Sequence, residues 1–94
     1  GQVPAGFELE VVETVATESG AQVEHFVFSD GMASISAYLE PPGDHALSGA
    51  HRMGSIGALG GEVAGHQATV IGEVPLATLQ AFIAGIEHVG EGGG

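Results

Sequence analysis

Cysteine, lysine and tryptophan are absent from this chain of 94 residues, and Arg52 is its single strongly basic residue. The absence of cysteine excludes disulfide bonds and thiolate chemistry. Twelve Asp and Glu residues give a formal net charge of −11, which repels nucleic-acid phosphates and anionic lipid headgroups. We therefore expect no nucleic-acid partner and no membrane attachment through a basic patch. The acidity indicates a solubilising surface or, as the alternative, a partner that carries basic residues.

Long apolar runs are absent as well. No segment approaches the ~20 apolar residues of a membrane-spanning helix, and no charged-then-apolar leader opens the chain. Apolar residues nevertheless make up 44% of the sequence and charged residues only 14%, which is typical of a globular protein. We expect one domain over residues 1–94, excised from a longer protein, with a flexible glycine-rich tail at residues 90–94.

The segment 23–41 predicts a β-hairpin. Residues 23–28 and, more weakly, 35–39 are rich in the β-branched and aromatic residues that favour strands. Asp30-Gly31 stands between them and predicts a tight turn, because glycine adopts a positive φ without a Cβ clash. Proline at positions 41 and 42 ends the second strand, since proline cannot donate to a ladder. Asp30 and Gly31 are therefore assigned a structural role.

Further strands are predicted on both sides of this hairpin. Residues 7–11 alternate apolar and acidic side chains, which is typical of a half-buried strand. Residues 53–59, 62–64 and 66–73 also have strand character, interrupted by glycines, of which Gly72 is assigned to a bend. The polar segment between positions 41 and 52 has no periodicity and predicts a long loop.

The hydrophobic period changes after Pro75. Leucine, phenylalanine and isoleucine residues then recur at spacings of three and four, which predicts an amphipathic helix. Pro75 suits the first helical position, where its missing N–H is not needed, and Gly90 is a natural stop. Strands followed by one helix predict an α+β fold: an antiparallel β-sheet of about five to six strands with one C-terminal α-helix packed on one face.

Five histidines among many carboxylates raise the question of a metal site. Asp44, His45 and His51 lie in the polar loop, and zinc accepts imidazole and carboxylate ligands. Their spacing matches no tight motif, so they are weak candidates and exposed loop histidines are the favoured interpretation. No G-x-S-x-G nucleophile motif is present. We expect a protein that is not an enzyme, without catalytic residues and without a cofactor.

Three blocks of this sequence resemble a known family, the C-terminal domain of the MucB/RseB proteins. The first is VEHFVFSDGMAS at residues 23–34, continued by LEP at 39–41. The second is RMGSI at residues 52–56, and the third is GHQATVIGEVP at residues 65–75. Phe7 after Pro4, Ala5 and Gly6 also fits the start of this domain. The blocks occur in the family's order and span most of residues 4–86.

The resemblance implies regulation by protein binding. MucB/RseB proteins are periplasmic negative regulators of the sigma-E envelope-stress response. They bind the periplasmic part of an RseA- or MucA-type anti-sigma factor and protect it from proteolysis. The resemblance further implies an N-terminal LolA-like domain, similar to lipoprotein carriers, and lipopolysaccharide-type lipids as effectors of the full protein. A periplasmic location follows from the resemblance alone.

The partner contact is predicted at His51, Arg52 and Met53, with an unpaired strand edge as a second recognition element. A single arginine in an acidic chain either ties the loop to the sheet or reaches an acidic group on a partner. Two alternatives remain open at this point. The first is a lipid-binding sensor that holds an acyl chain between the helix and the sheet, and the second is a metal site on the histidine loop.

Overall fold

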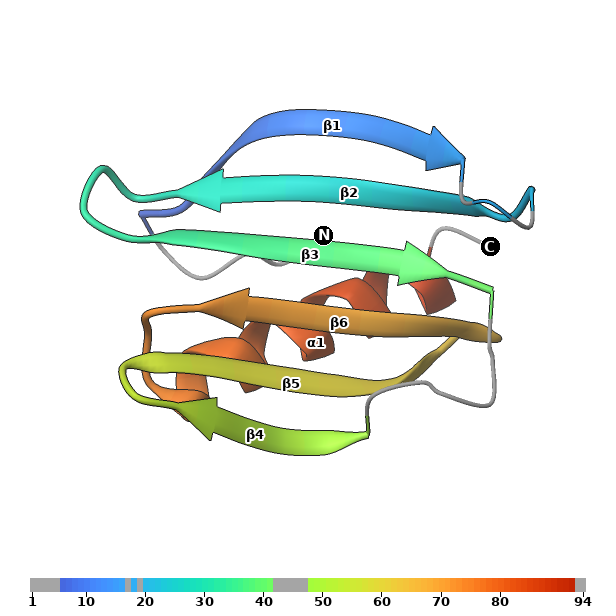
Figure 1. Ribbon diagram of the computed structural model, residues 1–94. Helices are drawn as coiled ribbons and strands as arrows, with labels where there is room; N and C mark the ends of the chain where they lie inside the picture. Colours follow the sequence, from blue (N-terminus) through green and yellow to red (C-terminus); the bar gives the residue numbers. More distant parts are fainter. Residues whose placement is uncertain (1–5, 17, 19, 42–47, 93–94) are drawn as a thin grey trace.

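The computed structural model describes residues 6–16, 18, 20–41 and 48–92 (Figure 1). In this part of the chain, six strands are followed by one helix, which confirms the predicted α+β fold class. The elements are β1 (Glu8–Ala16), β2 (Gln22–Ser29), β3 (Ser34–Glu40), β4 (Gly49–Met53), β5 (Ile56–Val63), β6 (His66–Gly72) and α1 (Leu76–Gly92).

All six strands belong to one antiparallel sheet with the order β1-β2-β3-β6-β5-β4 (Figure 1). The first three strands and the last three each form an up-and-down meander, and the pairing of β3 with β6 joins the two meanders. The strands that begin the two meanders, β1 and β4, therefore lie at the two edges of the sheet.

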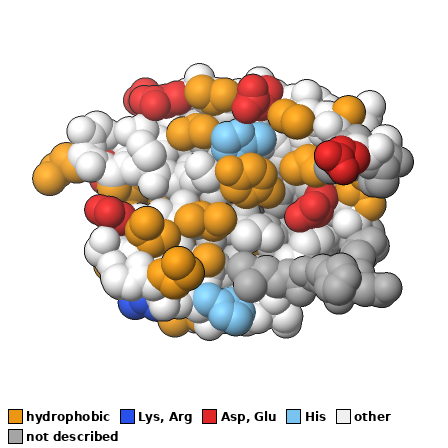
Figure 2. Space-filling model, viewed as in Figure 1, with side chains coloured by type: hydrophobic (Ala, Val, Ile, Leu, Met, Phe, Trp, Pro, Cys, Tyr) orange, Lys and Arg blue, Asp and Glu red, His pale blue; other side chains and the backbone are white. Residues whose placement is uncertain are grey.

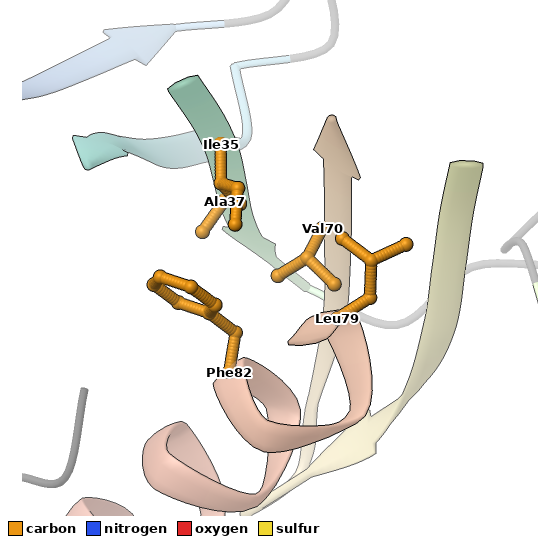
Figure 3. Packing of buried hydrophobic residues seen from close by; sticks show 5 residues of the cluster. All are labelled: Ile35, Ala37, Val70, Leu79 and Phe82. Atoms are coloured by element: carbon orange, nitrogen blue, oxygen red, sulfur yellow. The ribbon is translucent and has the colours of Figure 1, made fainter. Parts of the chain in front are cut away.

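Helix α1 lies on one face of the sheet and packs against β5 and β6 (Figure 1). The buried cluster beneath it consists of Ile35, Ala37, Val70, Leu79 and Phe82, which point toward one another from β3, β6 and α1 (Figure 3). These apolar side chains provide the burial that stabilises so small a domain. The predicted helix on one face is confirmed, and the other face carries no helix in the described residues.

The β2–β3 turn is longer than the predicted Asp-Gly turn. Ser29 pairs with Ser34, so the connection contains four residues, of which Gly31 has a φ of 90°. The Asp30 carboxylate accepts hydrogen bonds from the backbone N–H of Ala33, at 2.7 Å, and of Met32, at 2.9 Å. The carboxylate therefore occupies a position that a backbone carbonyl would take in a two-residue turn.

These hydrogen bonds predict a pH-dependent contribution of Asp30 to stability. The N–H groups of Ala33 and Met32 favour the ionised carboxylate and hold the pKa of Asp30 below its ordinary value of 3.8. A lowered pKa in the folded state contributes stability above pH 3.8, which is lost as the pH falls through that lowered pKa. We expect Asp30→Asn to melt below the wild type at neutral pH. The difference in melting temperature between the two proteins, measured by thermal melts, should narrow below pH 3.8. A constant gap down to about pH 2 contradicts this account.

The predicted loop before Arg52 is wrong in its second half. Residues 49–53 form β4, which pairs with β5 through a turn at Gly54 and Ser55. The segment 53–59 is therefore not one strand but the bend of a hairpin, since Gly54 has a φ of 64°. β4 is short and lacks a clear alternation of apolar and polar residues. It becomes a strand only because it pairs with β5. Asp44 and His45 lie outside the described residues.

The helix boundaries differ slightly from those predicted. The carbonyl of Pro75 accepts hydrogen bonds from the N–H groups of Thr78 and Leu79, so Pro75 is the N-cap and not the first helical residue. The helix continues through Gly90, the predicted stop, to Gly92. Glycine costs only about 1 kcal/mol relative to alanine within a helix, so it does not by itself end one. The predicted tail at residues 90–94 thus overlaps the helix.

Gly72 has a packing role rather than the predicted role in a bend. A Cβ at this position would lie 2.8 Å from the carbonyl oxygen of Ser34 and 3.0 Å from Cγ1 of Ile35. Gly72 pairs with both Ile35 on β3 and Gly57 on β5. Glycine is therefore required where β6 approaches β3 beside the core.

Candidate functional site

The face of the sheet opposite α1, here called the open face, has a strong apolar character. The register places Val11, Val27, Ser36, Ile71 and Ala58 in one row that crosses five strands on this face. An antiparallel sheet with one solvated face normally presents mostly polar residues there. Four of these five residues are apolar, so the row across the solvated face is a candidate for protein contact.

Other apolar side chains enlarge this surface on both sides of the row. By the same register, they are Val15, Val23, Tyr38, Ile56 and Met53. Four apolar residues of the open face exceed 40% exposure: Val11, Val15, Ile56 and Met53. Figure 2 shows hydrophobic side chains across this face, with acidic side chains at its upper border and toward one side. The open face is thus an apolar surface with an acidic border.

His25 and Tyr38 form a packed pair on the open face. Their rings stack with centroids 4.4 Å apart and an interplanar angle of 0°. His25 Nδ1 lies 3.0 Å from Oε1 of Glu13 on β1, so one side chain links three neighbouring strands. Nε2 of His25 is buried without a hydrogen-bond partner among the described atoms. Sequence reasoning missed this pair because it depends on the turn length, which sets the register between β2 and β3.

Strand β1 is the most exposed apolar element of the structure. All nine of its residues are exposed, and four of them are large and hydrophobic: Leu9, Val11, Val12 and Val15. The register changes between Leu9 and Val11, so a bulge redirects the strand at this point. In the sequence, the only sign of this bulge was the consecutive pair Val11 and Val12, which breaks the alternation of apolar and acidic residues.

The predicted contact residues His51, Arg52 and Met53 lie on β4 and do not share a face. His51 and Met53 are exposed on the open face, where His51 Nε2 lies 3.0 Å from the carbonyl oxygen of Ser48. Arg52 faces the helix side and donates to the carbonyl oxygens of Ser55 and Val74, both at 3.2 Å. The guanidinium thus links the β4–β5 turn to the segment before α1, instead of the predicted tie between loop and sheet.

The described structure gives little support to the two alternatives from the sequence, an acyl-chain site and a metal site. The space between α1 and the sheet is occupied by Leu79, Phe82, Ile35 and Val70, each at most 2% exposed, which leaves an acyl chain little room there. Within the described residues, no three His, Asp or Glu side chains gather in positions that could hold a metal ion. No helix in this part of the chain is long and apolar enough to span a membrane.

Comparisons with known proteins agree with the family resemblance seen in the sequence. A family model described as the MucB/RseB C-terminal domain matches residues 1–87. The chain is similar to the crystal structure of MucB in complex with MucA(peri), at 23% identity and a TM-score of 0.68, over 85% of this chain and 32% of that one. It is also similar to the Pseudomonas aeruginosa MucA/MucB complex, at 24% identity and a TM-score of 0.69, over 84% and 30%.

These structural matches confirm the fold, and they show how much of the longer chains it covers. The chain spans about a third of the length of the two chains it resembles. A comparison with curated proteins found no match.

Proposed function

The chain belongs to the MucB/RseB C-terminal domain family, and we propose that it is the protein-binding domain of a periplasmic negative regulator of the sigma-E response. Its partner is the periplasmic part of an RseA/MucA-type anti-sigma factor, which it helps to protect from proteolysis. The function is regulation by binding, with no catalytic step of its own. The family match over residues 1–87 is the observation that supports this proposal most strongly.

The surface of the described residues suits such a role. The open face and β1 expose apolar side chains that a solitary domain would normally bury or replace. The similar MucB chains are about three times longer than this one, so they contain more than this domain. The family resemblance implies that the proposed regulator likewise includes an N-terminal domain similar to LolA. Lipid effectors would act on that longer protein.

Calorimetric titration of this chain with the periplasmic segment of its own anti-sigma factor tests the proposal. We expect a Kd of about 1 μM or tighter, which corresponds to about −8 kcal/mol. An apolar interface should also produce a negative heat-capacity change, measured as the slope of the binding enthalpy with temperature. No detectable heat at several temperatures would exclude these residues as the recognition surface.

Alanine variants of β4 test whether the predicted contact residues take part. His51→Ala and Met53→Ala remove exposed side chains from the open face, so reduced affinity in either would place β4 in the interface. Arg52→Ala also removes two intramolecular hydrogen bonds. Its affinity must therefore be compared with its melting temperature, because lost structure and lost contact both weaken binding. Unchanged affinity in all three variants would exclude β4.

A further inference from the structure

We propose that the outer edge of β1 binds an extended segment of the partner as an additional strand, and that this segment alternates lysine or arginine with apolar residues. The inference rests on the proposed function and assigns its binding site. Strand addition uses main-chain hydrogen bonds for affinity and side-chain positions for specificity. The three arguments for β1 are its free edge, its apolar side chains and its charge.

The first argument is the free edge. β1 stands at the end of the strand order and pairs only with β2 among the described strands. It is nine residues long, whereas the opposite edge strand, β4, has five. In an antiparallel pair, alternate N–H and C=O groups point away from the neighbour, so β1 presents a row of backbone groups to an incoming strand.

The second argument is the apolar surface that continues on both faces of β1. Leu9 and Val12 pair with Phe28 and Phe26, which pack against the core on the helix side. On the other face, Val11 and Val15 pair with Val27 and Val23. A seventh strand added beyond the edge would therefore place its own side chains next to exposed hydrophobic residues on each face. This explains why β1 is apolar although none of its residues is buried.

The third argument is charge, and it identifies the occupant. β1 contains Glu8, Glu10 and Glu13, and of these only Glu13 makes a side-chain hydrogen bond in the described structure. A second copy of this chain would bring another net charge of −11 and another row of glutamates to the edge. Acidic residues and a bulge are devices that prevent such self-pairing. The same glutamates attract a strand with opposite charge.

No lysine or arginine of the chain pairs with these glutamates, and among the described residues Glu13 has His25 as its partner. Arg52 is the chain's one strongly basic residue, and its guanidinium donates to the carbonyl oxygens of Ser55 and Val74 on the far half of the sheet. Lysine or arginine residues opposite Glu8 and Glu10 therefore have to be supplied by the partner if they are present at all. The complementary partner segment places apolar side chains next to the four exposed hydrophobic residues of β1. Basic side chains alternate with these apolar ones.

A pair of charge-reversal variants tests the proposal by calorimetry with the periplasmic segment of the anti-sigma factor. Glu8→Lys with Glu10→Lys changes β1, and Glu24→Lys with Glu73→Lys is the control at two exposed glutamates outside β1, one on β2 and one just after β6. Both raise the net charge from −11 by the same amount, so long-range attraction changes equally. At about 0.15 M salt, we expect the β1 variant to lose about tenfold in affinity and the control less than about threefold.

Backbone amide exchange of the wild type, free and bound, is the second measurement. We expect the outward amides of β1 to become protected in the complex, because they acquire main-chain partners. Equal weakening by both charge variants, or binding without new protection in β1, overturns strand addition but leaves the proposed function standing. No binding by the wild type overturns both. Self-association of the free chain through β1, detected by sedimentation, would replace the partner by a second copy and also overturns the inference.

Discussion

Alanine in place of Phe82 is expected to lower the free energy of unfolding by about 3–5 kcal/mol. Phe82 is only 2% exposed and belongs to the buried cluster, where its ring points from α1 toward the sheet (Figure 3). Its ring meets Phe7 edge-on at a centroid distance of 5.3 Å and Phe28 at 5.1 Å. Removal of this ring leaves a cavity among residues that come from α1, β2 and the segment before β1.

Such a loss is large for a domain of this size, whose total stability is expected to lie within about 5–15 kcal/mol. Urea unfolding followed by circular dichroism measures it. Met32→Ala is the matched control, because Met32 is 96% exposed in the β2–β3 turn and should change stability by less than about 0.5 kcal/mol. If Phe82→Ala is unfolded in buffer, Phe82→Leu keeps most of the volume and gives a smaller, measurable loss. A loss below about 1 kcal/mol for the alanine variant contradicts the described packing.

The second large effect is expected from Gly72→Ala, which should destabilise the domain by about 1–3 kcal/mol although it adds a single methyl group. The new Cβ would lie 2.8 Å from the carbonyl oxygen of Ser34, a backbone atom that cannot rotate away. β3 and β6 would have to separate at the pair of Ile35 with Gly72, next to the core.

Gly61→Ala provides the control for this prediction. Gly61 lies on β5 and a Cβ there meets no atom within 4 Å, so alanine should be neutral or slightly stabilising through reduced freedom of the unfolded chain. Thermal melts of the two variants, made under identical conditions, give the comparison. Equal melting temperatures for both variants would show that β3 and β6 do not approach each other as closely as described.

Phe82→Ala and Gly72→Ala are also relevant to partner binding, because the core supports the edge strand β1. Phe28 packs on Phe82 and pairs with Leu9 of β1, so the core supports the strand to which we assign partner binding. A destabilised core should therefore weaken binding indirectly. This is why the charge variants on β1, which leave the core untouched, are the better test of the binding site.

Local patterns in the sequence were sufficient to predict most of the elements. The β-branched runs around Asp30-Gly31 predicted β2 and β3, and the three-and-four spacing after Pro75 predicted α1. The family blocks were equally local. β4 could not be predicted in this way, because five residues without alternation become a strand only when β5 pairs with them.

Side-chain periodicity and turn residues act between near neighbours, and they determined by themselves the α+β class, the hairpin and the helix. The family of this acidic chain followed from the resemblance of three sequence blocks, which the family model confirms. The tertiary structure decided the rest. It placed β1 at an open edge, stacked His25 on Tyr38 and turned Arg52 toward Val74. Each of these depends on strand order or register, which arise from contacts between residues far apart in the chain and therefore leave no local pattern in the sequence.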